Sequence, residues 1–224
     1  MSAIEGLRSL IWSLSCHIAF LRNVVLKSTD KDLTYFYCGM IHFITPCTRP
    51  DNLPKLEASI KKAKLHSNHD VLWHVCFDSS KVTGNNPINS DCVKLYSAKT
   101  YCNENPGKSQ INFVLTHFKL NIFEGFIYVL DDDNIIPDNF LAYNYNKEES
   151  LIYLFPQLFD KTSIREIMPA CNRIDQAQIL CHSSIQEFYS LDYNGDSKLI
   201  EKLCMKHPYK EMKNLVYYNY LTWI

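Results

Sequence analysis

The chain has 224 residues, a formal net charge of −1 at pH 7 and 46% hydrophobic residues. This length supports one sizeable core, and the near-neutral charge argues against nucleic acid as a partner, because phosphate binding leaves a broad basic footprint. The nine cysteines are odd in number and include no C-x-x-C pair, so they indicate reduced thiols in a cytosolic protein. With only six glycines, the chain has no G-x-G-x-x-G or Walker-type loop, which argues against dehydrogenases and nucleoside triphosphatases.

Residues 1–33 are predicted to form an amphipathic helical extension that precedes one main domain, residues 34–224. The apolar stretch between Arg8 and Arg22 is shorter than the ~20 residues that span a bilayer. No small-residue cleavage site marks a signal peptide. The pattern favours a helix that packs on the domain or on a second subunit of a homodimer. The alternative is peripheral contact with the inner face of a membrane.

The main domain alternates strand-like and helix-like segments. Strands are expected at 34–45, 70–80, 91–98 and 125–133, and helices after Asn52 and near residue 108. This alternation predicts an α/β fold with a mostly parallel central sheet, flanked by helices on both faces. The second half is less regular, with a strand at 150–159, a strand or helix at 173–188, a helix at 196–207 and an aromatic C-terminal segment that packs.

Three consecutive carboxylates, Asp131 to Asp133, follow the apolar strand "FIYVL". Because side chains alternate along a strand, Asp131 and Asp133 are expected on one side, and Asp132 on the other, tying down neighbouring backbone. In open α/β sheets, ligands bind beyond the carboxyl ends of the strands. Two carboxylates that converge there call for a cation, and Mg²⁺ or Mn²⁺ suits oxygen ligands and phosphates. The alternative is a polar loop with a local turn before Pro137.

Four stretches, taken in order, resemble the GT-A fold nucleotide-sugar glycosyltransferases, especially the family-2-like bacterial enzymes. They are "IHFITPCTRPDNLPKLEASI", "WHVCFDSS", "NPGKSQINFVL…EGFIYVLDDDNIIPDNFL" and "RIDQAQILCHSSI…LDYNGDSKLIEKL". The family's usual "DDGS" after the second strand is only "DSS" here. The resemblance implies transfer of a sugar from a UDP- or GDP-sugar to a hydroxyl of a glycan or lipid-linked glycan. It also implies a role in surface polysaccharide, lipopolysaccharide or capsule biosynthesis, in the cytoplasm or peripherally at the membrane.

The resemblance also implies roles for individual residues. Those that would border the nucleotide are Thr45, Pro46, Arg49, Asp78 and Lys108. Within this set, Arg49 would pair with a phosphate and Asp78 would contact the base. Asp131 would contact ribose or metal, and Asp133 would coordinate a metal that bridges the diphosphate. A late histidine supplies a third metal ligand in some relatives, which suggests His207 or, alternatively, His182.

The acceptor hydroxyl needs a base if the reaction inverts the sugar. The candidates are Asp175, Glu187, Asp192 and Asp196. The family pattern favours Asp196 first and Asp192 second, although Asp196 is also suited to cap a helix. Side chains assigned to the sugars are Asp132, Asp175 and Gln176.

Two other functions remain open from the sequence. A nucleotidyltransferase acting on sugar phosphates also uses an α/β sheet with metal-binding carboxylates. It would show a glycine-rich loop after the first strand, and "TPCTRPDNLP" has no glycine. A non-catalytic domain that binds sugar nucleotides is the other alternative, and the intact pair Asp131 and Asp133 argues mildly against it.

Overall fold

The computed structural model describes residues 39–81, 88, 91–99, 107–121, 124–143, 145, 150–159, 162–168, 174–191 and 194–222. The predicted N-terminal extension, its boundary with the main domain and Asp192 lie outside these ranges. No helix within them is long and apolar enough to cross a membrane.

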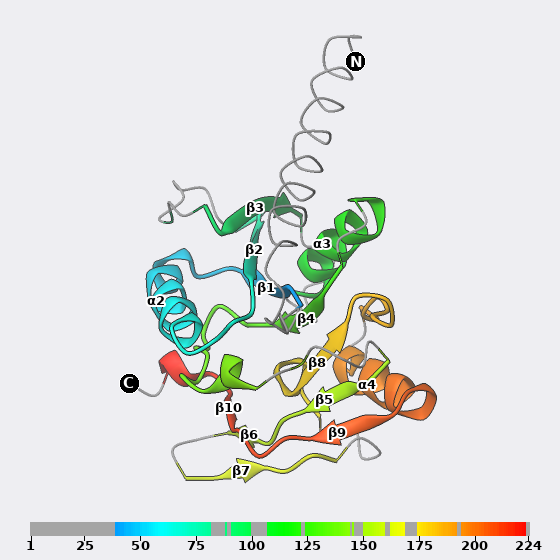
Figure 1. The fold of residues 1–224 in the computed structure, drawn as a ribbon. Coiled ribbons are helices and arrows are strands. Elements are labelled where there is room, and N and C mark those ends of the chain that lie inside the picture. The colour runs from blue at the N-terminus through cyan, green and yellow to red at the C-terminus, as the bar shows by residue number, and fades with distance from the viewer. Residues whose placement is uncertain are drawn as a thin grey trace, which may run out of the picture. The chain divides into compact units, whose positions relative to one another are not determined.

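A seven-stranded sheet forms the centre of the domain (Figure 1). In spatial order its strands are β3 (Val93–Ala98), β2 (Val71–Asp78), β1 (Ile41–Cys47), β4 (Phe126–Val129), β8 (Ile179–His182), β5 (Ile152–Leu154) and β9 (Tyr209–Glu211). The first four are mutually parallel, β8 is antiparallel to both neighbours, and β9 is parallel to β5. This order confirms the predicted α/β fold with a mostly parallel central sheet.

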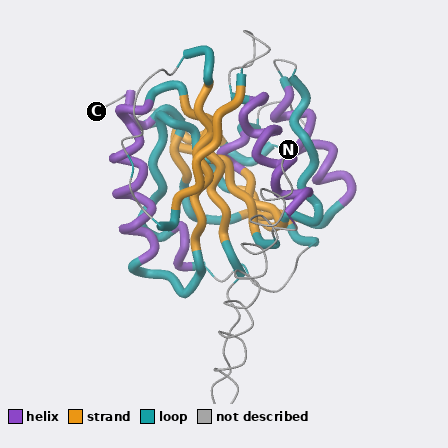
Figure 2. The backbone as a smooth tube through the Cα atoms, turned by 90° about the horizontal axis from the view of Figure 1, so that it is seen from above, coloured by secondary structure: helices purple, strands orange, loops and turns teal. Residues whose placement is uncertain are grey.

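Helices cover both faces of the sheet (Figure 2), which explains why every residue of β1 is buried. On one face, α2 (Leu53–Lys64) packs its apolar side against residues such as Phe43 and Trp73. On the other face, α3 (Lys108–Asn121) and α4 (Gly195–Lys206) belong to a second apolar cluster that includes Ile44. The two cores make the sheet a rigid platform for the loops at its edge.

The expected strand at 150–159 is divided in the structure. Pro156 lies between β5 and β6 (Gln157–Leu158), and its missing N–H prevents a continuous ladder there. β6 pairs with β10 (Val216–Tyr217) and β7 (Ile164–Arg165) to form a separate three-stranded sheet. Likewise, the segment expected as strand or helix at 173–188 contains the short 3-10 helix η4 (Gln176–Gln178) followed by β8.

The sheet delivers the three aspartates to its carboxyl edge. β4 pairs with β1, and one further hydrogen bond, from Leu130 N to Ile44 O (2.9 Å), extends this pairing beyond β4. The chain then turns, with Asn134 N donating to Asp131 O at 3.0 Å. The C-terminal 3-10 helix η5 (Tyr220–Thr222) contacts the same turn, because Leu221 N donates to Asp133 O at 2.8 Å.

Candidate active site

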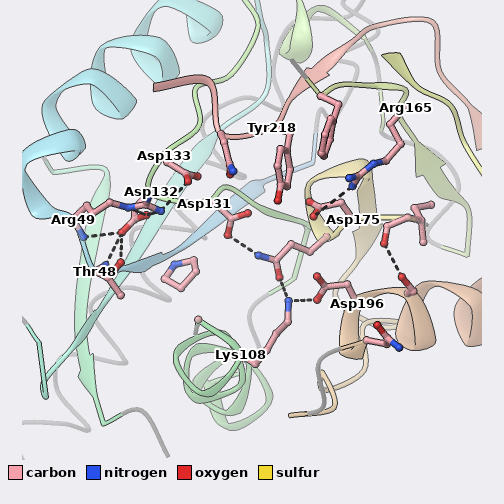
Figure 3. A pocket seen from close by; sticks show the side chains of 18 of the residues that line it. Thr48, Arg49, Lys108, Asp131, Asp132, Asp133, Arg165, Asp175, Asp196 and Tyr218 are labelled. Atoms are coloured by element: carbon pink, nitrogen blue, oxygen red, sulfur yellow. Dashed lines mark hydrogen bonds and ion pairs between the residues drawn. The ribbon is translucent and has the colours of Figure 1, made fainter. Parts of the chain in front are cut away.

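A cavity of about 790 Å³ opens beside the three aspartates (Figure 3). This volume lies within the range of small-molecule sites. Its described lining comes from the loop after β1, the aspartate turn, the first turns of α3 and α4, η4 and the small sheet. The lining includes five aspartates and three cationic side chains: Asp131, Asp132, Asp133, Asp175, Asp196, Arg49, Lys108 and Arg165.

Asp132 is turned toward the loop that follows β1. Its Oδ2 accepts hydrogen bonds from Thr48 N (2.6 Å), Thr48 Oγ1 (3.1 Å) and Arg49 N (2.8 Å). Its Oδ1 accepts from Arg49 Nε (2.8 Å) and Nη2 (2.5 Å). Asp132 is only 2% exposed. Both oxygens therefore hold the β1 loop in place, and the predicted contact of Asp132 with a sugar stays a prediction.

Asp133 and Asp131 face different partners. Arg49 Nη2 lies 2.9 Å from Asp133 Oδ2, so the guanidinium bridges Asp132 and Asp133. Asp131 Oδ1 accepts a hydrogen bond from Gln176 Nε2 at 2.5 Å. Arg49, which was predicted to pair with a phosphate, is here engaged by two carboxylates while about half of its side chain stays exposed.

A polar chain links Asp131 to Asp196. The amide of Gln176 donates to Asp131 and its Oε1 accepts from Lys108 Nζ at 2.5 Å. Lys108 Nζ also forms an ion pair with Asp196 Oδ1. Figure 3 shows this series of contacts from Asp131 to Lys108 and Asp196. Gly107 (φ +97°) precedes Lys108, and a Cβ there would lie 3.1 Å from Pro46 Cγ, so glycine permits the close approach of α3 to the end of β1.

Burial dominates the electrostatics of this chain. It raises the pKa of Asp131 to about 8, helped by the neighbouring charges of Asp175 and Asp133. Burial also lowers the pKa of Lys108 to about 8, against the opposing effect of Asp131. The pKa of Asp133 is raised by burial, although Arg49 acts in the other direction. Burial therefore disfavours the ionised form of both carboxyl groups, and a cation beside them would favour it.

Asp131 and Asp133 both line the cavity, and their donor set fits a hard divalent cation, because carboxylate oxygens are the ligands that Mg²⁺ and Mn²⁺ prefer. Across the described ranges, no three side chains of His, Cys, Asp or Glu cluster to hold a metal on their own. An ion at these two carboxylates would therefore need further oxygen ligands, which a diphosphate offers.

The structure brings together most of the residues singled out from the sequence. The cavity lining includes Pro46, Arg49, Lys108, Asp131, Asp132, Asp133, Asp175, Gln176 and Asp196. Thr45 and Asp78 are fully buried and lie outside this lining. Thr45 Oγ1 accepts a hydrogen bond from Trp73 Nε1 (2.8 Å), and Asp78 Oδ1 accepts from Ser80 Oγ (2.6 Å).

The two histidines considered as metal ligands are also outside the lining. His207 follows the last turn of α4, where its N–H donates to Leu203 O at 2.9 Å. His182 ends β8, and its Nδ1 lies 2.8 Å from Ser184 Oγ.

Sequence reasoning missed the wall built by the small sheet. Phe159, Arg165 and Tyr218 line the cavity, although they lie in segments with little regular structure. Their signal in the sequence is faint, because strands of two residues leave no readable alternation. The cluster of aromatic residues near the C-terminus was the one available indication.

No protein-family model and no curated sequence matches the chain. Solved structures do match, and they share the α/β fold with its mostly parallel central sheet. S. aureus TarS 1-349 in complex with UDP-GlcNAc aligns with TM-score 0.59 and 12% identity, over 80% of this chain and 58% of that one. A mannosyltransferase from Pyrobaculum calidifontis, in complex with GDP-Man and Mn²⁺, aligns with TM-score 0.56 and 10% identity, over 93% of this chain and 67% of that one.

The chain spans about 60% of the TarS 1-349 structure. At such low identity the likeness shows the fold alone. The finer resemblance to family-2-like enzymes stays a prediction.

Proposed function

We propose that the protein is a glycosyltransferase that moves a sugar from a UDP- or GDP-sugar to a hydroxyl acceptor. The observation that carries the proposal is one cavity, at the carboxyl edge of the sheet, whose lining includes Asp131, Asp133 and Asp196. Ligand sites of open α/β sheets lie at this edge. The solved neighbours include structures with UDP-GlcNAc and with GDP-Man and Mn²⁺, which supports this substrate class.

In this proposal, Asp131 and Asp133 would hold Mn²⁺ or Mg²⁺, and such an ion would supply positive charge to a diphosphate leaving group. Asp132 keeps the loop after β1 in place, because it binds the backbone of both Thr48 and Arg49. Arg49 is partly exposed at the cavity wall, and its guanidinium pairs with Asp133. If a metal cation neutralised Asp133 instead, the guanidinium would be available to pair with a phosphate.

Asp196 is the proposed base for an inverting transfer. It lies in the first turn of α4 and lines the cavity, where its carboxylate pairs with Lys108. Gln176 contacts both Lys108 and Asp131. These contacts therefore help to fix the separation between Asp131, a proposed metal ligand, and Asp196, the proposed base. The alternative base, Asp192, lies outside the described residues.

From the sequence resemblance we infer that the acceptor is a glycan or a lipid-linked glycan. We also infer that the protein acts in polysaccharide biosynthesis. Residues 1–33 would then contact a membrane surface or form a homodimer. Sedimentation without detergent and flotation with liposomes separate these two outcomes.

The test is turnover of a panel of UDP- and GDP-sugars, measured as release of the nucleoside diphosphate with and without Mn²⁺. Asp133→Asn should lower metal-stimulated turnover by about 10²-fold or more, because it removes one of two proposed metal ligands. Asp138→Asn is the matched control, since Asp138 is exposed and pairs with Lys62 at 2.7 Å. Full activity of Asp133→Asn would remove the metal assignment. Donor binding without turnover in the wild type would favour a non-catalytic sugar-nucleotide-binding domain.

A further inference from the structure

The small sheet presents one face of its strands to the cavity. Pairing continues one residue past β6 on both sides, because Tyr218 N donates to Leu158 O (3.1 Å) and Phe159 N donates to Ser163 O (2.9 Å). Phe159 therefore lies beside Tyr218, in line with the β6–β10 register, and Gln157 lies opposite Arg165. Since side chains alternate along a strand, Gln157 and Phe159 point to the same face of the small sheet. Their neighbours on the adjacent strands, Arg165 and Tyr218, point to that face as well.

An aromatic pair results on this face. The rings of Phe159 and Tyr218 stack with centroids 4.8 Å apart and planes at 18°. The Cζ atom of Arg165 lies 4.5 Å from the Phe159 ring and 5.2 Å from the Tyr218 ring. Phe159 keeps 40% of its surface exposed, and both rings line the cavity. A large apolar surface left open inside a polar cavity indicates a ligand with an apolar face.

Hydrogen-bonding groups border the rings. Arg165 Nη1 donates to Gln157 Oε1 at 3.1 Å and lies 4.0 Å from Asp175 Oδ2. Asp175 uses its other oxygen, Oδ1, to cap η4 by accepting from Ala177 N at 2.9 Å. A guanidinium and a carboxylate oxygen thus stand beside the aromatic pair. This arrangement suits neighbouring hydroxyls, which both donate and accept hydrogen bonds.

Charge decides between an uncharged and an anionic ligand. Arg165 is already paired with Asp175, whose Oδ2 lies 4.0 Å from Arg165 Nη1. An anion on this wall would compete with Asp175 for Arg165 and would lie close to the Asp175 carboxylate. An uncharged ligand avoids this repulsion and keeps the ion pair intact.

We propose that Phe159, Tyr218, Arg165 and Asp175 form the acceptor subsite, and that it takes an uncharged saccharide. The C–H face of a pyranose ring lies on the aromatic pair, and its hydroxyls reach Arg165 and Asp175. In Figure 3, Arg165 and Tyr218 stand on the opposite side of Asp131 from Arg49, so this subsite faces the proposed donor end across the cavity. The inference rests on the proposed function, because it names the acceptor class of the same site.

The test measures binding of saccharides to the full chain by ligand-observed NMR. The probes are the methyl glycosides of glucose, galactose, mannose and N-acetylglucosamine, with glucuronic acid and glucose 6-phosphate as anionic counterparts. We expect saturation transfer from aromatic protons to the ring C–H protons of at least one neutral probe, and weaker binding of both anions. Tighter binding of either anion, or binding of none of the neutral probes, overturns the proposal.

Phe159→Leu keeps an apolar side chain but removes the ring. It should weaken binding of the neutral probe about 3- to 10-fold, which is the size of effect expected for one aromatic contact. Phe188→Leu is the control, because Phe188 is similarly exposed (44%) and lies outside this cavity. Equal weakening in both variants, or no weakening in Phe159→Leu, contradicts the aromatic subsite.

Nucleotide binding separates this inference from the proposed function. UDP and GDP are titrated with Mn²⁺ by calorimetry in the same samples. If a nucleotide binds and none of the saccharide probes binds, only the acceptor subsite is overturned. Absence of nucleotide binding counts against the proposed function, whatever the saccharides do. Loss of nucleotide binding in Phe159→Leu would show that the ring supports the fold rather than the acceptor.

Discussion

Replacing Asp132 by asparagine tests whether this residue organises the site rather than binding a ligand. The carboxylate accepts five hydrogen bonds, three from Thr48 and the backbone of Arg49 and two from the Arg49 guanidinium. An amide of the same shape keeps one acceptor oxygen and turns an NH₂ group toward the other donors. One of the two groups of donors therefore loses its partner.

The size of the effect follows from burial. Asp132 is 2% exposed, and hydrogen bonds to a charged group contribute about 1.5–3 kcal/mol each when buried. The Arg49 side chain is 48% exposed, so its share is screened by water and counts for less. Loss of two or three of the backbone and hydroxyl contacts gives a decrease of at least about 3 kcal/mol in the free energy of unfolding. This is a large part of the ~5–15 kcal/mol available to a domain.

Urea unfolding followed by circular dichroism measures the effect. Asp138→Asn is the control from the same acidic segment, because its ion pair with Lys62 is exposed and screened by water. We expect Asp132→Asn to be the far less stable variant. Equal stability of the two variants would refute the assignment of Asp132 to the β1 loop.

Two further predictions concern the sheet. Burial lowers the pKa of His42 from 6.5 to about 4 and that of His74 to about 2, so the folded protein keeps both rings neutral while the unfolded chain binds protons below about pH 6.5. The contribution of His42 to stability, present above pH 6.5, is therefore lost as the pH falls toward 4, by roughly 3 kcal/mol, and imidazole NMR signals that titrate near pH 6.5 in the folded protein would contradict it. Gly125→Ala should cost more than about 1 kcal/mol, because φ is +139° and the new Cβ would lie 2.3 Å from Met40 O. Gly39→Ala, whose Cβ meets nothing closer than 3.9 Å, should stay within about 0.5 kcal/mol in the same unfolding assay.

The fold could be predicted because local patterns carry it. Buried parallel strands appear as continuous apolar runs, and helices show one apolar side, so the alternation of β1, α2 and β2 is visible in the sequence. The aspartates at the end of β4 could be placed as well, because a parallel strand ends at the ligand-binding edge.

The pairing of side chains could not be predicted in the same way. Arg49 and Asp132 are 83 residues apart, and Lys108 and Gln176 are 68 residues apart. Such contacts depend on the register of neighbouring strands and on where a helix begins, which no local pattern specifies. The sequence therefore suggested that Arg49 and Lys108 face the nucleotide, whereas the structure shows each held by side chains from distant segments.

The small sheet could not be predicted from the sequence for a different reason. β6, β7 and β10 contain two residues each, and they are held by pairing with one another rather than by a readable alternation. The aromatic pair of Phe159 and Tyr218 exists only because two such strands lie side by side.

The central claim is that Asp131 and Asp133 hold a cation that binds a nucleoside diphosphate. Calorimetric titration of UDP and GDP into the protein, with and without Mn²⁺, measures this directly. We predict that one nucleotide binds only when Mn²⁺ is present, and that Asp133→Asn abolishes this binding while Asp138→Asn retains it. Binding that is independent of Mn²⁺ and unchanged in Asp133→Asn, or no binding of either nucleotide, would contradict the claim.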